Sequence, residues 1–392
     1  MTEIVSAWGD NSNGQLGDGT TTGRPTPGPV SGLAGVRTVE SGSGHVVALL
    51  DDGTAVAWGR NAFGQVGDGA VDVNQHEPVP VKGLKNIKDV VPGGGQTLYL
   101  LEDGTVWGAG GGFFGLLGPA NMRLHPVPVL VDGIDEVVQL ISGGGHAVAL
   151  RADGTVWTWG RDDYGQLGDG PDANDRVPGR TYQEHAGRGY DSRPAPTKID
   201  GLGEVRGLAA GGGHSVAIQT DGTVWTWGDN DRGQLGHGDT EHLSSPKKVE
   251  GITTAVAATC AYHHTVVLLE DGTLQAFGIN DRGQLGDGTT EDKLTPVEVK
   301  GLSGVKLVTG TGGGGEVNPG NYGHTLALLE DGTVWSWGCN DKGELGNGTT
   351  DRRVVAEPVP SLTGVRHLTV GGEVPISREN PGGGYALAIH TA

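Results

Sequence analysis

Cysteine is scarce in this 392-residue sequence, because Cys260 and Cys339 are its only two copies. Two cysteines are too few for a disulfide-stabilised scaffold or a tetrahedral all-cysteine metal site. No apolar run approaches the roughly 18–20 residues that span a bilayer, and the first residues lack the basic and apolar stretches of a signal peptide. We therefore expect a cytoplasmic protein that does not contact membranes.

Basic residues are also few, with 27 Lys and Arg against 47 Asp and Glu and a formal net charge of −20. An acidic surface repels the phosphate groups of nucleic acids and the headgroups of anionic membranes. We therefore expect no nucleic-acid partner.

Familiar catalytic motifs are absent. The glycine runs lead into apparent strands and contain no Gly-x-x-x-x-Gly-Lys-Ser/Thr phosphate loop, and there is no His-Glu-x-x-His, nucleophile elbow or cysteine pair. We expect neither a metal nor a cofactor, and these absences leave open whether the protein is an enzyme.

Glycine is abundant, with 75 copies, and it recurs within a repeated phrase that holds three anchors. The copies are about 50–68 residues apart, a period typical of propellers and solenoids. The first anchor, usually histidine, falls at His45, Gln96, His146, His214, His264, His324 and Tyr385. The second, usually Trp-Gly, falls at Trp8, Trp58, Ala109, Trp159, Trp227, Phe277 and Trp337. The third, Gly-Gln-Leu-Gly or a relative, begins at Gly14, Gly64, Gly115, Gly165, Gly233, Gly283 and Gly343.

The local pattern of each repeat is that of four β-strands. Asp-Gly pairs between Val-, Leu- and Trp-rich stretches predict two-residue hairpins in which both turn residues have positive φ. In the third repeat the strands are expected near 137–141, 146–151, 155–159 and 196–199. Every fourth strand carries proline, which cannot donate a ladder hydrogen bond, so this strand is predicted at the outer edge.

The ends of the sequence complete the ring. Residues 385–390 follow a first strand and supply a second, whereas residues 4–8 and 27–30 read as a third and a fourth. Pairing these halves leaves no open edge. We predict an all-β, seven-bladed β-propeller of four-stranded blades, closed two-plus-two. The single domain, 1–392, has blades at about 36–82, 87–131, 136–199, 205–249, 253–299, 305–360, and 365–392 paired with 1–31.

The combination of Gly-x-x-His, Asp-Gly-Thr-Val-Trp and Gly-Gln-Leu-Gly resembles the regulator of chromosome condensation repeat family along essentially the whole chain. The resemblance implies a seven-bladed propeller with a role in protein interaction. The family includes a nucleotide exchange factor for a small GTPase and an ultraviolet-B photoreceptor. Glycines such as Gly144-Gly145 stand where the photoreceptor carries Trp and Arg, so we do not expect light sensing.

Residues shared by nearly all repeats are interpreted as structural. The anchor histidines are expected to be half-buried and bonded to nearby backbone, and the tryptophans to form the core between blades. Long insertions at 310–322, 371–384 and 171–193 all fall on one face, which we call the upper face because the first strand of each blade ends there. Loops elaborated on one side of a rigid scaffold usually carry function.

Residues that vary between repeats are the candidates for binding. The position before each Gly-Gln-Leu-Gly is aromatic on one arc of the ring and cationic on the other, and such side chains commonly anchor interfaces. The candidate partner-binding residues are Phe63, Phe114, Tyr164, Arg232, Arg282, Lys342, Tyr262, Tyr322, Glu379 and Tyr385.

Three functions remain open. The leading hypothesis is a monomeric scaffold that binds a protein or peptide through its upper face. The second is an enzyme with an acid/base site at the mouth of the central shaft, with Glu316, Glu373, His263 and Arg378 as candidate catalytic residues. The third is a regulator of a small GTPase similar to an exchange factor.

Overall fold

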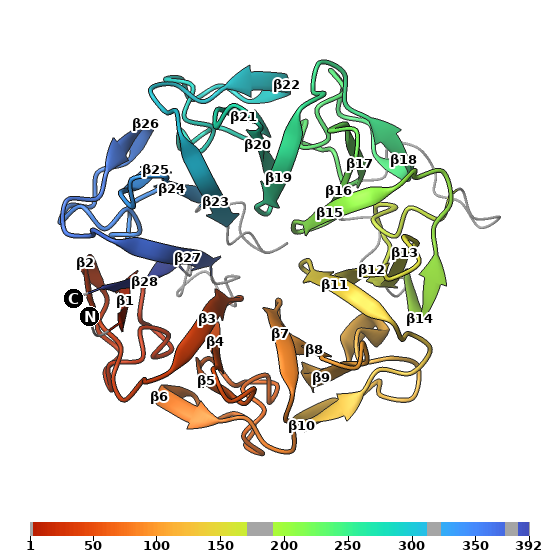
Figure 1. The fold of residues 1–392 in the computed structure, drawn as a ribbon, viewed down its shortest axis with the longest axis vertical. Coiled ribbons are helices and arrows are strands. Elements are labelled where there is room, and N and C mark those ends of the chain that lie inside the picture. Colours follow the sequence, from red (N-terminus) through yellow and green to blue (C-terminus); the bar gives the residue numbers. More distant parts are fainter. Residues whose placement is uncertain (1–2, 171–190, 312–322, 373–382, 392) are drawn as a thin grey trace.

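Seven four-stranded antiparallel sheets form a ring of blades around a central shaft (Figure 1). This computed structural model describes residues 3–170, 191–311, 323–372 and 383–391. The arrangement confirms the predicted all-β, seven-bladed propeller.

Six blades take their strands in chain order, from the innermost first strand to the outermost fourth. Blade 1 contains β3 (Val36–Ser41), β4 (His45–Leu50), β5 (Ala55–Gly59) and β6 (Gln75–Pro80). Blade 2 contains β7 (Ile87–Pro92), β8 (Gln96–Leu101), β9 (Val106–Gly111) and β10 (Leu124–Leu130). Blade 3 contains β11 (Val137–Ser142), β12 (His146–Arg151), β13 (Val156–Arg161) and β14 (Ser192–Lys198). Blade 4 contains β15 (Val205–Ala210), β16 (His214–Gln219), β17 (Val224–Gly228) and β18 (Leu243–Lys248). Blade 5 contains β19 (Ala255–Cys260), β20 (His264–Leu269), β21 (Leu274–Gly278) and β22 (Lys293–Glu298). Blade 6 contains β23 (Val305–Thr311), β24 (His324–Leu329), β25 (Val334–Gly338) and β26 (Arg353–Pro358).

Blade 7 joins the two ends of the chain. Its strands, from the shaft outwards, are β27 (Val365–Gly372), β28 (Gly384–Thr391), β1 (Glu3–Gly9) and β2 (Arg24–Pro29). β1 pairs with β28 in an unbroken antiparallel register from Glu3 opposite Thr391 to Gly9 opposite Tyr385. The N- and C-termini therefore lie side by side (Figure 1), and the two-plus-two closure is confirmed.

Helix is almost absent from the described part of the chain. Its one helical element is the single 3-10 turn η1 (Phe113–Gly115). Among the described residues, no helix is both long and apolar enough to cross a membrane.

The Asp-Gly turns differ from the predicted hairpin. In the first of them, the Leu50 N–H donates to the carbonyl of Thr54, so three residues form the loop, and only Gly53 has positive φ (76°). The Asp52 carboxylate instead accepts hydrogen bonds from the Thr54 N–H (2.9 Å) and hydroxyl (2.6 Å). The two-residue turn was therefore wrong, because an aspartate that caps the following threonine favours a three-residue loop ending in a left-handed glycine.

All three repeat anchors meet at the seam between neighbouring blades. At the seam of blades 3 and 4, His146 Nε2 lies 2.9 Å from the Ser215 hydroxyl, which donates to the Gln166 carbonyl at 3.0 Å. The same carbonyl accepts the Trp227 indole N–H at 2.9 Å. Since Ser215 donates to the carbonyl, we assign the Nε2–H tautomer to His146. The repeated phrase thus encodes an inter-blade hydrogen-bond network.

The anchor histidines are more deeply buried than expected. Their side chains are fully or almost fully inaccessible. Nε2 of four of them lies 2.9–3.4 Å from a hydroxyl of the next blade, in His45, His146, His214 and His264. Burial lowers the pKa of His45 to about 3 and that of His214 to about 4. These rings are therefore neutral structural groups at ordinary pH.

One anchor position carries an unusual charge. Glu344 stands where Gln284 stands in the preceding blade, and both side chains accept the backbone N–H two residues earlier at 2.8 Å. Glu344 is completely inaccessible, and burial raises the pKa of its carboxyl to about 7. The Gly384 N–H also donates to Glu344, at 3.3 Å.

Candidate functional site

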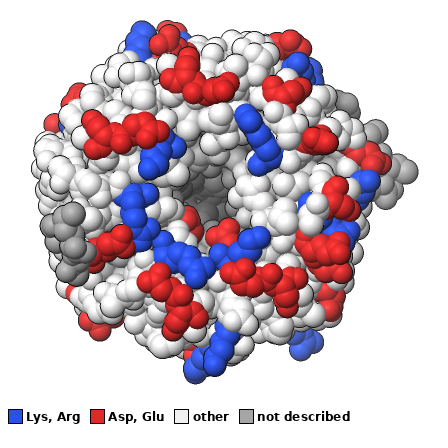
Figure 2. Space-filling view, in the orientation of Figure 1, with Lys and Arg blue, Asp and Glu red and all other residues white. Residues whose placement is uncertain are grey.

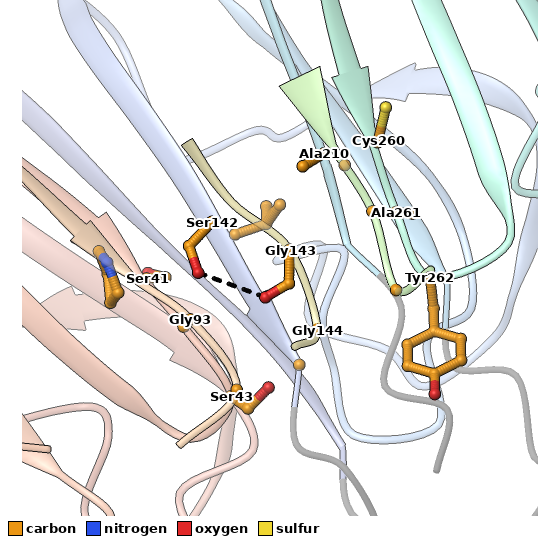
Figure 3. Close-up of a pocket in the computed structure, with 18 of the residues that line it drawn as sticks. Ser41, Ser43, Gly93, Ser142, Gly143, Gly144, Ala210, Cys260, Ala261 and Tyr262 are labelled. Atoms are coloured by element: carbon orange, nitrogen blue, oxygen red, sulfur yellow. Dashed lines mark hydrogen bonds between the residues drawn. The ribbon is translucent and has the colours of Figure 1, made fainter. Parts of the chain in front are cut away.

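The upper mouth of the shaft is an open pocket of about 230 Å³. Most of its described lining residues are Gly, Ser or Ala, from the ends of the first strands and the glycines that follow them. Figure 3 shows the Ser142 hydroxyl bonded to the Gly143 carbonyl (3.4 Å), with Tyr262 as the large aromatic side chain beside these small residues. Among the described residues, these small side chains leave space at the mouth.

An apolar pocket of about 260 Å³ adjoins this mouth between blades 1 and 2. It is lined by Phe63, Phe113 and Phe114, and it shares Gly94 and Gly144 with the shaft pocket. The Phe63 and Phe113 rings meet edge to face with centroids 5.1 Å apart, while 46% of Phe113 remains exposed. An aromatic pair of this kind supplies a large, rigid apolar surface.

Arginines hold the aromatic side chains in place. The Arg60 guanidinium lies 5.5 Å from the Phe63 ring centroid, and Arg161 lies 5.5 Å from Phe114 and 5.6 Å from Tyr164. The aromatic arc predicted from the repeat position is therefore a set of alternating arginine and aromatic side chains. Sequence reasoning missed Arg60 and Arg161, although both follow the Trp-Gly step directly.

A cluster of histidine and aspartate lies farther around the upper face, in blades 4 and 5. Asp229, 3% exposed, places one carboxylate oxygen 3.4 Å from His242 Nδ1 and the other 3.4 Å from His263 Nδ1. Burial opposes ionisation of Asp229, but the hydrogen bond and charge of His263 outweigh it and lower the pKa of Asp229 to about 2. Asp229 is therefore a buried carboxylate between two imidazoles.

Asp229, Asp231 and His242 are close enough together to be considered as metal ligands. The Asn230 N–H donates to His242 Nδ1 at 2.9 Å, so the neutral ring carries its proton on Nε2. That nitrogen, 3.5 Å from Asp231, then has no lone pair for a metal. Hydrogen bonding therefore accounts for the cluster without an ion.

The cationic arc is loosely neutralised. Arg232 lies 3.7 Å from the Asp292 carboxylate and Arg282 lies 4.0 Å from the Asp341 carboxylate. Lys342 is exposed. These ion pairs are weak because all their members are accessible to water. The cations can therefore leave these carboxylates and pair with carboxylates of a binding partner.

The other described candidates occupy different environments. Tyr385 is completely buried, and its hydroxyl lies 2.8 Å from the carbonyl oxygens of both Gly42 and His45, which share its one proton, so its side chain serves the closure seam and not a surface. Tyr262 lines the shaft mouth, whereas His263 is not among the described lining residues of that pocket. The candidates Glu316, Tyr322, Glu373, Arg378 and Glu379 lie outside the described residues.

A polar cluster lies where the shaft meets its upper mouth, which Glu40 lines. His367 Nε2 lies 3.1 Å from Glu40 and 2.9 Å from the Val39 carbonyl, and Thr38 donates to Glu40 at 2.9 Å. Burial and the charge of Glu40 raise the pKa of Asp89 to about 6. This cluster therefore combines two carboxyl groups with a histidine that pairs with one of them.

Comparison with known proteins identifies relatives. A model of the RCC1-like domain family matches residues 4–376. The E3 ubiquitin-protein ligase HERC2 of Homo sapiens is 30% identical over 248 residues, covering 61% of this chain and 5% of HERC2. The ultraviolet-B receptor UVR8 of Arabidopsis thaliana is 30% identical over 248 residues, covering 62% of this chain and 53% of UVR8. The chain thus matches only about half of UVR8 and a small fraction of HERC2.

The solved structure of Prp20p from Saccharomyces cerevisiae has the same fold. It superposes with a TM-score of 0.78 at 20% sequence identity, covering 100% of this chain and 92% of Prp20p.

Proposed function

The chain belongs to the RCC1-like domain family, and from this premise we propose that it is a propeller scaffold that binds a protein or peptide through its upper face. The observation that carries the proposal is the apolar pocket lined by Phe63, Phe113 and Phe114 beside the open mouth of the shaft. Prp20p binds Gsp1p and histones, which gives a precedent for protein partners on this fold.

The chemistry of the upper face favours a partner that has an apolar anchor and, elsewhere on its contact surface, acidic groups. An apolar side chain of the partner would enter the pocket and cover Phe113, which is 46% exposed. Buried aromatic anchors of this kind each contribute on the order of 2 kcal/mol or more to binding. The accessible Arg232 and Lys342, on the other arc of the upper face, would engage carboxylates elsewhere on the partner.

The described groups give the enzyme hypothesis less support. Glu40 is the one carboxylate among the described residues that line the shaft mouth, and His263 pairs with Asp229 elsewhere. The other residues proposed for catalysis lie outside the described chain, so binding is the better supported function.

The test is quantitative affinity capture from lysate of the source cell. The double variant Phe63→Ser/Phe113→Ser removes the aromatic pair. Val127→Ser/Leu130→Ser is the matched control, because both side chains are exposed (37% and 39%) but lie on β10, the outermost strand of blade 2, away from the shaft. We expect a protein that wild type enriches to fall by about tenfold or more with the aromatic variant and to persist with the control.

Equal retention of that protein by both variants would show that the aromatic pocket is not the binding site. Thermal unfolding of both variants serves as the folding control. A small GTPase among the captured proteins would then be tested for accelerated nucleotide release.

A further inference from the structure

The lower mouth of the shaft carries a repeated positive charge. In every blade, the first residue of the first strand is buried and the second residue is exposed. Five of these seven residues are cationic and two are valine, and none is acidic although acidic residues outnumber basic ones in the chain. We call this set the collar: Arg37, Lys88, Val138, Arg206, Val256, Lys306 and Arg366.

Collar side chains reach from blade to blade around the shaft. Lys88 donates to the Val138 carbonyl at 3.2 Å, Arg206 donates to the Ala255 carbonyl, and Arg366 donates to the Val36 carbonyl at 2.7 Å. Each acceptor belongs to the start of the next first strand. Figure 2 shows Lys and Arg side chains grouped around the central hole of the disc, with many Asp and Glu side chains farther out.

Most of the collar charge is not neutralised within the described chain. Arg366 pairs with Glu3 at 2.7 Å, whereas no ion pair to a described carboxylate is found for Arg37, Lys88, Arg206 or Lys306. Backbone carbonyls accept their hydrogen bonds but carry no net charge. The collar therefore offers several cations to an anionic ligand.

The surrounding acidic turns limit the width of that ligand. Arg37 lies 3.4 Å from the carbonyl of Asp51, so the turn that carries Asp52 borders the collar. In blades 2 to 6 the first residue of the first strand likewise pairs with the residue just before the Asp-Gly turn. A duplex nucleic acid or a flat anionic membrane is wide enough to lie over these carboxylates as well as the cations, and the carboxylates would repel it. A narrow peptide would not.

We propose that the lower mouth is a second binding site, which takes an acidic peptide segment that also carries apolar side chains. Glutamate or aspartate side chains pair with the collar cations, and apolar side chains contact Val138 and Val256, where the charge is interrupted. The segment lies across the mouth, where the collar cations are exposed. This site is separate from the upper face, so it does not depend on the function proposed there.

The test is fluorescence anisotropy with a labelled oligoglutamate peptide that contains leucines. The collar variant Lys88→Glu/Lys306→Glu is compared with Lys82→Glu/Lys300→Glu, which changes the net charge equally at two exposed lysines outside the collar. We expect the collar variant to weaken binding by about tenfold or more, the control by much less, and the wild-type affinity to fall steeply with added salt.

Three results would overturn the proposal: no binding to wild type, equal loss in the two variants, or duplex DNA that binds as tightly as the peptide. A matched peptide with glutamine in place of glutamate should not bind. If a lowered melting temperature shows that the charge-reversed variant folds poorly, Lys88→Gln/Lys306→Gln replaces it in the binding assay. This milder variant removes the two charges without reversing them.

Discussion

Replacing Glu344 by glutamine should stabilise the protein at neutral and alkaline pH. In the folded chain, burial raises the pKa of this carboxyl from the ordinary value of 4.5 to about 7. In the unfolded chain the Glu344 carboxyl ionises above pH 4.5, whereas in the folded chain it stays protonated until about pH 7. The native state therefore loses stability as the pH rises from about 4.5 to 7, and below pH 4.5 this carboxyl has no effect on stability. Each pKa unit corresponds to about 1.4 kcal/mol, which gives a cost of about 3 kcal/mol above pH 7.

Glutamine should fit this position because Gln284 makes the equivalent hydrogen bond at 2.8 Å. The amide replaces the oxygen that accepts the Gly384 N–H at 3.3 Å, and losing that bond costs about 1 kcal/mol. We therefore expect Glu344→Gln to raise the free energy of unfolding by about 2 kcal/mol at pH 8 and to have no benefit near pH 4.

Urea unfolding at several pH values measures this difference. The reciprocal variant Gln284→Glu should introduce the same pH-dependent loss in blade 5. If Glu344→Gln and wild type changed in parallel between pH 4 and pH 8, the assigned burial of a raised-pKa carboxyl would be refuted.

Three further substitutions test the seams and the closure. Trp159→Phe removes the 2.9 Å bond from the indole to the Leu116 carbonyl, and it should lower the free energy of unfolding by about 1–3 kcal/mol; an unchanged urea midpoint would contradict the bond. Ser215→Ala should cost about 1–3 kcal/mol in the same assay, because it leaves His146 and the Gln166 carbonyl without their shared partner, while Ser43→Ala, at a half-buried serine beside the shaft mouth, should cost less. Ile389→Ala, at a fully buried position opposite Val5, should cost about 2–5 kcal/mol by calorimetry, and a neutral effect would argue against the clasp of β1 and β28.

The architecture could be predicted from the sequence because it is set by local patterns repeated seven times. Proline at Pro78 and its equivalents indicated the edge strand, and the complementary half-repeats at the two ends indicated the closure. The hairpin type was wrong because the side-chain bonds of Asp52 were not considered. The bonds of the anchor histidines were misassigned because their partners, such as Ser215, belong to the next blade.

The candidate site was predicted only in part, because binding positions differ between repeats. The aromatic arc was visible at Phe63, Phe114 and Tyr164, but the sequence did not indicate that Arg161 lies between two of these rings or that Tyr385 is buried.

By itself the sequence determined the number of blades, the order of the strands and the way the ring closes, since these depend on periodicity and on residue types within one repeat. Only the tertiary structure decided which side chains meet across the seams, how the pocket beside Phe113 forms and how the collar surrounds the lower mouth. The physical reason is that contacts between blades join residues far apart in the sequence, such as Thr265 and Gln234 (31 positions) or His146 and Ser215 (69 positions), and ring closure fixes their distances independently of any local pattern.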